Sequence, residues 1–214
     1  KRENDILLVT GLDGSLVGEN GQMGAYTNVE LNYLISDGAN ITIATERTPA
    51  SLLSVLGNIN LKLPVIAMDG AVLFDTNEKR YLCCQAIPME IVKKMCCIFE
   101  ERNRHYFVNM VLEDALLIFY GTFHNDVEKK LYMDMRSSPY RNYVYGEFPE
   151  DGDVVYFLLV DTIENIDVIE KEIKKQYYAD ELLFLRDSSE TPEGYCHFKI
   201  YHKNATKQFM VEQL

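Results

Sequence analysis

The sequence predicts an α/β protein in which a parallel β-sheet is interrupted by an inserted α+β domain. Apolar runs alternate with helical stretches over the first 75 residues, and the runs cover 6–9, 41–44 and 64–68. This alternation is typical of a parallel sheet with right-handed crossovers. After residue 75 the order changes to helix–strand–strand and then strand–helix–strand, which indicates a mostly antiparallel sheet. We therefore expect a Rossmann-like core domain over 1–81 and 191–214, and an inserted domain over 82–190.

The first apolar run and the turn after it are the most informative stretch. Four consecutive apolar residues, Ile6 to Val9, are too few for a helix and suit a strand buried on both faces of a parallel sheet. The run ends at Thr10 and Gly11, and Asp13 follows just past the carboxyl end of the strand. Open α/β sheets bind their ligands at that end. Asp13 is therefore a candidate functional residue.

Capping signals delimit three helices of the core. Thr27 and Glu30 have the spacing of a capping box, which predicts a helix that begins there. Thr48 and Pro49 supply an N-cap and a proline at the first helical position of a second helix, which runs to about residue 57. Asn204 is the predicted cap of a final helix over 205–214.

The inserted region has its own pattern of elements. The predicted order is helix 88–105, strands 106–112 and 115–120, helix 126–136, strand 154–160, helix 165–177 and strand 182–185. A further strand, 195–201, is predicted after the inserted region.

Charge and composition restrict the class of protein. The net charge of −12 argues against non-specific binding of nucleic acid, which needs Lys and Arg to neutralise phosphates. The N-terminal apolar run is far too short for a secretory signal or a membrane span, so we expect a cytoplasmic protein without a membrane partner. Five cysteines without a C-x-x-C motif favour reduced thiols, and His105 and His124 stand alone in the sequence.

The stretch from Ile6 to Ser15 resembles the first motif of the haloacid dehalogenase superfamily, an apolar strand followed by D-x-D-G-T/S. In that family the first Asp attacks phosphorus and the second acts as acid and base. Here the second acid is Asp13, followed by Gly14 and Ser15, and the nucleophile position is Gly11. The resemblance thus implies that the nucleophile has been lost.

Further motifs are similar to those of the Cof-type sugar-phosphate phosphatases, a branch of this superfamily with an inserted cap domain. Thr45, followed by Glu46 and Arg47, matches a strand that ends in Thr or Ser and continues with Gly-Arg. Asp69-Gly70-Ala71 stands where the family has Asn-Gly-Ala, and Lys207 matches the lysine of the third motif. The fourth motif is absent before Leu214, so the resemblance implies a core domain that continues beyond this residue.

The resemblance implies catalytic positions at Asp13, Thr45, Lys207 and the lost nucleophile Gly11. It also implies that Arg47, in the segment 45–47, contacts the substrate, as do Asp69 and Gly70. Mg²⁺ is the implied cofactor, with the Asp13 backbone carbonyl as the remaining ligand, and we expect this chain to bind the ion weakly. A small phosphorylated metabolite, such as a sugar phosphate, is the implied partner.

Two functions of different class stay open on the sequence. The first is a hydrolase of the sugar-phosphate phosphatase type that is catalytically impaired, because glycine cannot attack phosphorus. The second is a non-catalytic relative that binds a phosphorylated metabolite or a protein partner.

Overall fold

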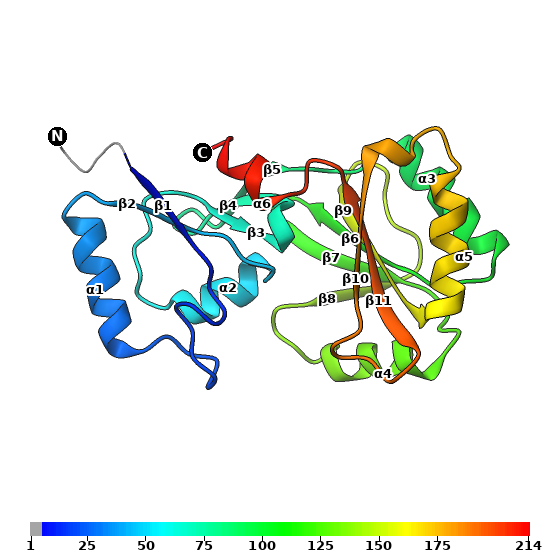
Figure 1. The fold of residues 1–214 in the computed structure, drawn as a ribbon, viewed down its shortest axis with the longest axis horizontal. Helices are drawn as coiled ribbons and strands as arrows, with labels where there is room; N and C mark the ends of the chain where they lie inside the picture. The colour runs from blue at the N-terminus through cyan, green and yellow to red at the C-terminus, as the bar shows by residue number, and fades with distance from the viewer. Residues whose placement is uncertain (1–5) are drawn as a thin grey trace. The chain divides into compact units, whose positions relative to one another are not determined.

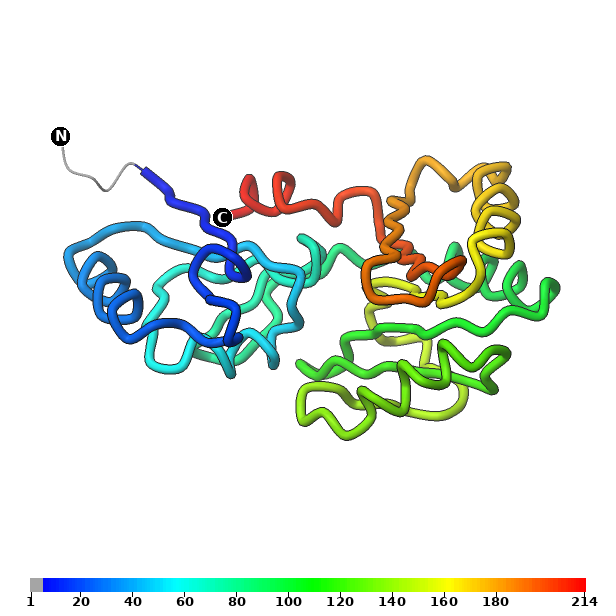
Figure 2. The backbone as a smooth tube through the Cα atoms, turned by 60° about the horizontal axis from the view of Figure 1, so that its bottom comes forward, coloured from blue at the N-terminus to red at the C-terminus, as the bar shows by residue number. Residues whose placement is uncertain are grey.

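The computed structural model describes residues 6–214, and these form two compact units (Figure 1). One unit comprises the chain up to Cys84 together with Asn204–Leu214, and the other comprises Gln85–Lys203. The backbone passes from the first unit to the second and returns once, as the tube in Figure 2 shows. The second unit is therefore an insertion in the first. The assignment of 82–190 to a separate cap domain stays a prediction.

The first unit is built on short strands that pair side by side. β1 (Leu7–Thr10) pairs in parallel with β2 (Asn40–Ile43). A parallel bridge between Ala44 and Ile66 joins β2 to β3 (Val65–Ala67). The chain then turns back through η2 (Met68–Gly70) into the antiparallel strands β4 (Val72–Asp75) and β5 (Arg80–Cys84). The predicted parallel arrangement of the first three strands is confirmed, and β5 is an element that the sequence pattern did not predict.

Three helices belong to this unit: α1 (Ala25–Ser36), α2 (Pro49–Leu56) and α6 (Lys207–Val211). The predicted start of α2 is confirmed, because the Thr48 side chain accepts a hydrogen bond from the Ser51 N–H and Pro49 follows the cap. α2 buries Leu52 and Leu56 in the core beside Ile43. Here local sequence and tertiary packing favour the same structure.

The other two predicted caps are wrong. α1 begins two residues before Thr27, its N-cap is Gly24, and no side chain caps it. Thr27 therefore lies inside the first turn, where a capping box cannot form. α6 has Thr206 as its N-cap, with its side chain accepting from the Phe209 N–H, so Asn204 lies outside the helix.

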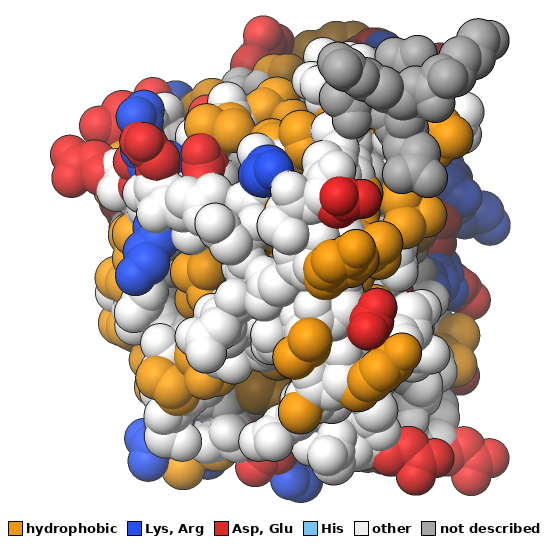
Figure 3. All heavy atoms as spheres, turned by 90° about the vertical axis from the view of Figure 1, so that its left-hand side faces the viewer, with side chains coloured by type: hydrophobic (Ala, Val, Ile, Leu, Met, Phe, Trp, Pro, Cys, Tyr) orange, Lys and Arg blue, Asp and Glu red, His pale blue; other side chains and the backbone are white. Residues whose placement is uncertain are grey.

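β1 is also more exposed than its composition predicts. Leu8 is 52% exposed and Ile6 is 69% exposed, so the expectation of a strand buried on both faces is wrong. Among the residues that the structure describes, β1 pairs with β2 alone and is an edge strand. Figure 3 views the molecule from the side of α1 and shows further hydrophobic side chains on the surface, in keeping with the exposure of Tyr26 and Tyr33.

The second unit is an α+β structure around one six-stranded sheet, with strand order β10-β11-β9-β6-β7-β8. Every pair is antiparallel except β7 with β8, which confirms the predicted mostly antiparallel sheet. Its elements are α3 (Met89–Glu101), β6 (Phe107–Leu112), β7 (Ala115–Tyr120), α4 (Asp126–Met135), β8 (Asn142–Tyr145), β9 (Asp153–Thr162), α5 (Ile163–Lys174), η3 (Ala179–Glu181), β10 (Leu182–Asp187) and β11 (Tyr195–His202).

The amphipathic helices α3 and α5 cover one face of this sheet. Val92 and Phe99 of α3 and Ile166 of α5 are fully buried against Phe157 and Phe198 of the sheet. β8 was not predicted from the sequence, and the other strands of the sheet were. With this unit inserted in a parallel core, the predicted fold class, a Rossmann-like α/β core with an inserted α+β domain, is confirmed.

A buried polar network secures the start of α4. The Gly121 N–H donates to His105 Nε2 at 3.1 Å, so the neutral ring carries its proton on Nδ1, which donates to Glu128 Oε2 at 3.0 Å. Glu128 also accepts from the Asn125 N–H at 2.9 Å, and the Asn125 side chain accepts in return from the Glu128 N–H. His105, isolated in the sequence, thus contacts Glu128, which forms the reciprocal cap of α4 with Asn125.

Within residues 6–214, no helix has the length and apolar character needed to cross a membrane.

Candidate functional site

The loop after β1 is a compact turn anchored by Leu12. Leu12 is buried, and its carbonyl oxygen accepts hydrogen bonds from the Leu16 N–H at 2.9 Å and the Val17 N–H at 3.0 Å. Gly14 has a φ of +75°, a conformation that glycine adopts at little cost. Because Leu12 points inward, the neighbouring Asp13 is exposed on the outside of the turn.

Asp13 forms a bidentate ion pair with Arg47. Arg47 Nε donates to Asp13 Oδ2 at 2.9 Å, and Nη2 donates to Oδ1 at 2.6 Å. The two residues are 34 positions apart, and parallel pairing of β1 with β2 brings their loops to the same edge of the sheet. The planar guanidinium matches the carboxylate, and this geometry gives the strongest kind of charge-assisted hydrogen bond.

This pairing changes the acid–base properties of both groups. The hydrogen bonds from Arg47 lower the pKa of Asp13 below its ordinary value, although partial burial opposes the shift. The same bonds raise the pKa of Arg47. Asp13 is therefore ionised at neutral pH and holds no proton that it could donate.

Arg47 is itself held by its neighbours. Its N–H donates to Thr45 Oγ1 at 3.1 Å, and its carbonyl accepts from the Met68 N–H at 3.0 Å. Its Nη1 lies 3.4 Å from Ser51 Oγ, a contact that sequence reasoning missed although Ser51 follows Arg47 by one helical turn. Thr45 is buried, and its hydroxyl supports the turn that presents Arg47.

Gly11 lies in the open, between the end of β1 and Leu12. Its backbone does not adopt the left-handed conformation that requires glycine, and a Cβ added to it would lie 3.3 Å from Ser15 Oγ. A small rotation of the Ser15 side chain would relieve that contact. The local backbone can therefore carry a side chain at position 11.

Gly70 brings the start of α6 to the turn after β3. Met68 and Asp69 have φ values of +51° and +61°, and Gly70 has a φ of +100°. A Cβ at Gly70 would lie 2.4 Å from the backbone N of Lys207, so only glycine permits this approach. The structure thereby joins two positions, Gly70 and Lys207, that are 137 residues apart in the sequence.

The sequence of the chain matches one family over almost its whole length. The profile of the haloacid dehalogenase-like hydrolases matches residues 8–214. The chain belongs to this family. No curated protein matches it significantly.

Several solved structures have the same fold. TM0651 from Thermotoga maritima is 21% identical with a TM-score of 0.69, over 97% of this chain and 73% of that one. The haloacid dehalogenase subclass IIB sugar phosphatase BT4131 is 23% identical with a TM-score of 0.65, over 97% and 74%. A protein from Eubacterium rectale is 16% identical with a TM-score of 0.75, also over 97% and 74%. At these identities the likeness establishes the fold.

Haloacid dehalogenase-like hydrolases generally use Mg²⁺, and the side chains at this loop do not fit that ion. Magnesium takes oxygen ligands, most often carboxylates. Gly11 has no side-chain oxygen, and the Asp13 carboxylate is already bound to Arg47. No group of three or more His, Cys, Asp or Glu residues within 6–214 is arranged to hold a metal. Coordination through the Asp13 carbonyl stays a prediction, as do the roles assigned to Thr45 and Lys207.

Proposed function

We propose that this haloacid dehalogenase-like protein has the fold of a sugar-phosphate phosphatase, is impaired in phosphoryl transfer, and binds a phosphorylated metabolite without hydrolysing it. One observation carries the proposal. The position that resembles the nucleophile is Gly11, and the remaining acid of the motif, Asp13, is bound in two contacts to Arg47.

The chemistry follows from these two residues. Covalent phosphoryl transfer needs a nucleophilic side chain, and glycine has none. A general acid must hold a proton near neutral pH, and the ion pair lowers the pKa of Asp13 instead. Both changes reduce hydrolysis, through different steps.

Arg47 is the residue that supports phosphate binding. A guanidinium recognises phosphate through two parallel N–H donors, as it recognises a carboxylate. Arg47 is partly accessible, with its side chain 27% exposed, and Ser51 Oγ lies beside it as a further polar group. A phosphate would take the place that the Asp13 carboxylate occupies. Lys207, exposed at the start of α6, is a second proposed contact.

A small metabolite fits this chain better than nucleic acid does. Its net charge of −12 disfavours a long phosphate backbone, while a single phosphate needs only a local cation. A cytoplasmic location belongs to the same proposal.

Hydrolysis and binding assays test the two halves of the proposal. With excess Mg²⁺, we expect no measurable release of phosphate from p-nitrophenyl phosphate or glucose 6-phosphate. Titration calorimetry with inorganic phosphate should detect binding that Arg47→Met weakens about tenfold, since hydrogen bonds to charged groups contribute roughly 1.5–3 kcal/mol. Arg80→Met, a change at an exposed arginine 4.0 Å from Glu78, should leave binding unchanged. Robust Mg²⁺-dependent hydrolysis by the unmodified chain would overturn the proposal.

Gly11→Asp tests the cause of the impairment. The backbone at position 11 accepts a side chain, so the variant should fold with a change in stability within about 1 kcal/mol. Its melting temperature should rise when Mg²⁺ is added, and that of the unmodified protein should not, because the variant adds a charged carboxylate ligand. Gly11→Asn, which has the same shape without the charge, is the matched control. An equal response of all three proteins to Mg²⁺ would contradict the role assigned to position 11.

A further inference from the structure

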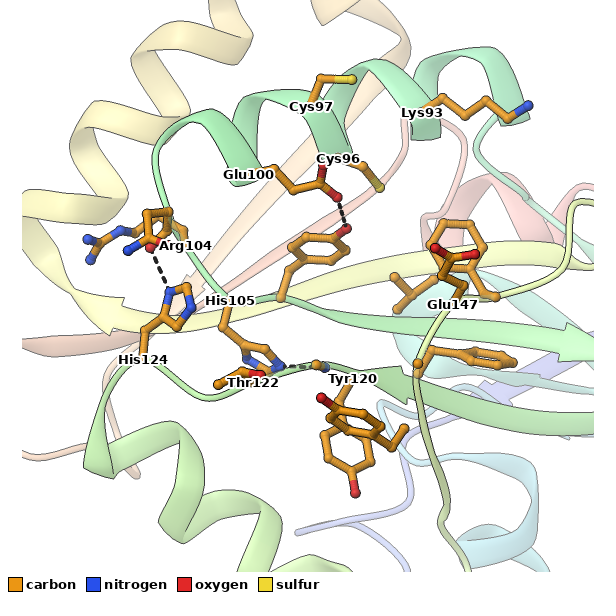
Figure 4. A pocket seen from close by; sticks show the side chains of 18 of the residues that line it. Lys93, Cys96, Cys97, Glu100, Arg104, His105, Tyr120, Thr122, His124 and Glu147 are labelled. Carbon is orange, nitrogen blue, oxygen red and sulfur yellow. Dashed lines mark hydrogen bonds between the residues drawn. The ribbon is translucent and has the colours of Figure 1, made fainter.

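The second unit contains a cavity of about 740 Å³ that is separate from Asp13 and Arg47 (Figure 4). Residues of α3, β6 and β7 line it, together with the segments 103–106, 121–124 and 145–150. All of these belong to Gln85–Lys203. The volume lies in the range of roughly 300–1,000 Å³ that is usual for small-molecule sites.

The inner wall of the cavity is apolar and aromatic. Val108 and Phe119 lie opposite each other on β6 and β7, and the ring of Phe148 meets Phe119 edge to face at 6.2 Å. Cys96 projects from α3 toward this space in Figure 4, and the ring of Tyr106 adds a further aromatic surface. A flat apolar body would therefore be desolvated on several sides.

The polar atoms inside this wall are uncharged at neutral pH. Burial raises the pKa of Cys96 to about 11, so the thiol stays protonated and is a poor nucleophile. Burial also raises the pKa of Tyr106, whose hydroxyl donates to Glu100 Oε1 at 3.0 Å. The inner wall thus offers contact area rather than covalent chemistry.

The charged groups at the rim leave an excess of negative charge. Both cations of the lining are already paired with acids. Lys93 Nζ lies 2.6 Å from Glu150 Oε1, and Arg104 Nη1 lies 3.2 Å from Asp161 Oδ2.

The two remaining carboxylates of the lining are Glu100 and Glu147. Neither forms an ion pair with any residue in the described range 6–214. Glu100 lies on α3 and Glu147 on the segment after β8 (Figure 4). Carboxylates on two sides of an aromatic cavity favour a cation, which can also interact with the ring faces.

We propose that this cavity binds a small organic cation with a flat apolar body, of the aryl-alkylamine class. The ring would lie against Phe119 and Phe148, and the ammonium group would lie near Glu100 and Glu147. This site is independent of the phosphate site proposed above, because no residue is shared.

A fluorescence titration with tryptamine tests the proposal directly. The chain has no tryptophan, so indole fluorescence reports the probe alone. Two control probes carry the same ring. Indole-3-propionate has a negative charge, and 3-ethylindole has no charge. We expect saturable binding of tryptamine, with a rise in anisotropy, at least about tenfold tighter than that of indole-3-propionate. Absence of saturable tryptamine binding, or equal affinity for the cationic and anionic probes, would overturn the proposal.

Charge reversal at the rim locates the binding. Glu147 is exposed, so Glu147→Lys should fold normally and weaken tryptamine binding about tenfold. Glu101→Lys makes the same change on an exposed residue of α3 outside the lining and should leave the affinity unchanged. An equal effect of the two variants would refute the assignment to this cavity, because only net charge would then matter. Cys96→Phe should abolish binding by filling the inner wall, with circular dichroism to confirm the fold.

Discussion

Asp13→Asn should make this protein bind inorganic phosphate more tightly, although the same change removes the one acid retained from the catalytic motif. In the unmodified protein, Arg47 is occupied by two hydrogen bonds of 2.6 and 2.9 Å to Asp13. A phosphate that binds Arg47 must displace this carboxylate. The amide of Asn keeps the size of the side chain and removes both the charge and the pair.

The size of the effect follows from the exposure of the pair. The Asp13 side chain is 54% exposed and that of Arg47 is 27% exposed, so the pair is screened by solvent. Ion pairs in such positions contribute about 0–1 kcal/mol. Relieving competition of about 1 kcal/mol corresponds to about fivefold tighter binding, since roughly 1.4 kcal/mol is a factor of ten.

Titration calorimetry with inorganic phosphate measures this change. Asp37→Asn, which removes the same charge from an exposed position of the first unit, is the control and should leave the dissociation constant within about twofold. Unchanged or weaker binding by Asp13→Asn would refute the reasoning, because it would mean that phosphate does not compete with Asp13 for Arg47.

Three other predictions concern stability. Gly70→Ala should lower the free energy of unfolding in urea by roughly 2–4 kcal/mol, because its Cβ would lie 2.3 Å from the backbone before α6 at a φ of +100°; a cost below about 1 kcal/mol would show that α6 moves away freely. Glu128→Gln should lower the free energy of unfolding by about 3 kcal/mol in the same assay, since its amide NH₂ would face the Nδ1–H of His105 in a buried site. An unchanged midpoint of urea unfolding would contradict the proton position assigned to His105. Because the pKa of Asp13 is lowered in the folded protein, its ion pair stabilises the protein above the unfolded carboxyl pKa of about 3.9, and this contribution disappears as the pH falls through the folded pKa. Asp13→Asn should therefore lose less stability than the unmodified protein over that acidic range. Parallel profiles of stability against pH for the two proteins would argue against the pair.

Local patterns in the sequence determined the order of elements and the fold class. Thr48 and Pro49 start α2 because an N-cap and a first-position proline act within four residues of chain. Most strands of both units are likewise visible as short apolar runs. The strands that the pattern missed, β5 and β8, carry only partly or fully exposed side chains, so their pairing partners rather than their composition define them.

Long-range contacts decided the rest. Thr27 and Glu30 have the spacing of a capping box, but the chain enters α1 earlier and places Thr27 within the first turn. Ile6 and Leu8 were expected to be buried, and they are exposed because little of the described chain packs on their side chains. The exposure of Ile6 and Leu8 depends on what packs against them, which the local sequence pattern does not contain.

The candidate site was likewise predicted in part from the sequence and decided in part by the tertiary structure. Asp13 could be singled out from its place just after a strand, and Gly11 and Arg47 from the resemblance of their motifs to those of the family. Their meaning came from the ion pair between Asp13 and Arg47, which only the parallel register of β1 and β2 creates. The cavity of the second unit had no signal in the sequence, because three elements and three further segments form its wall and rim, and these come together only when the sheet and α3 are packed.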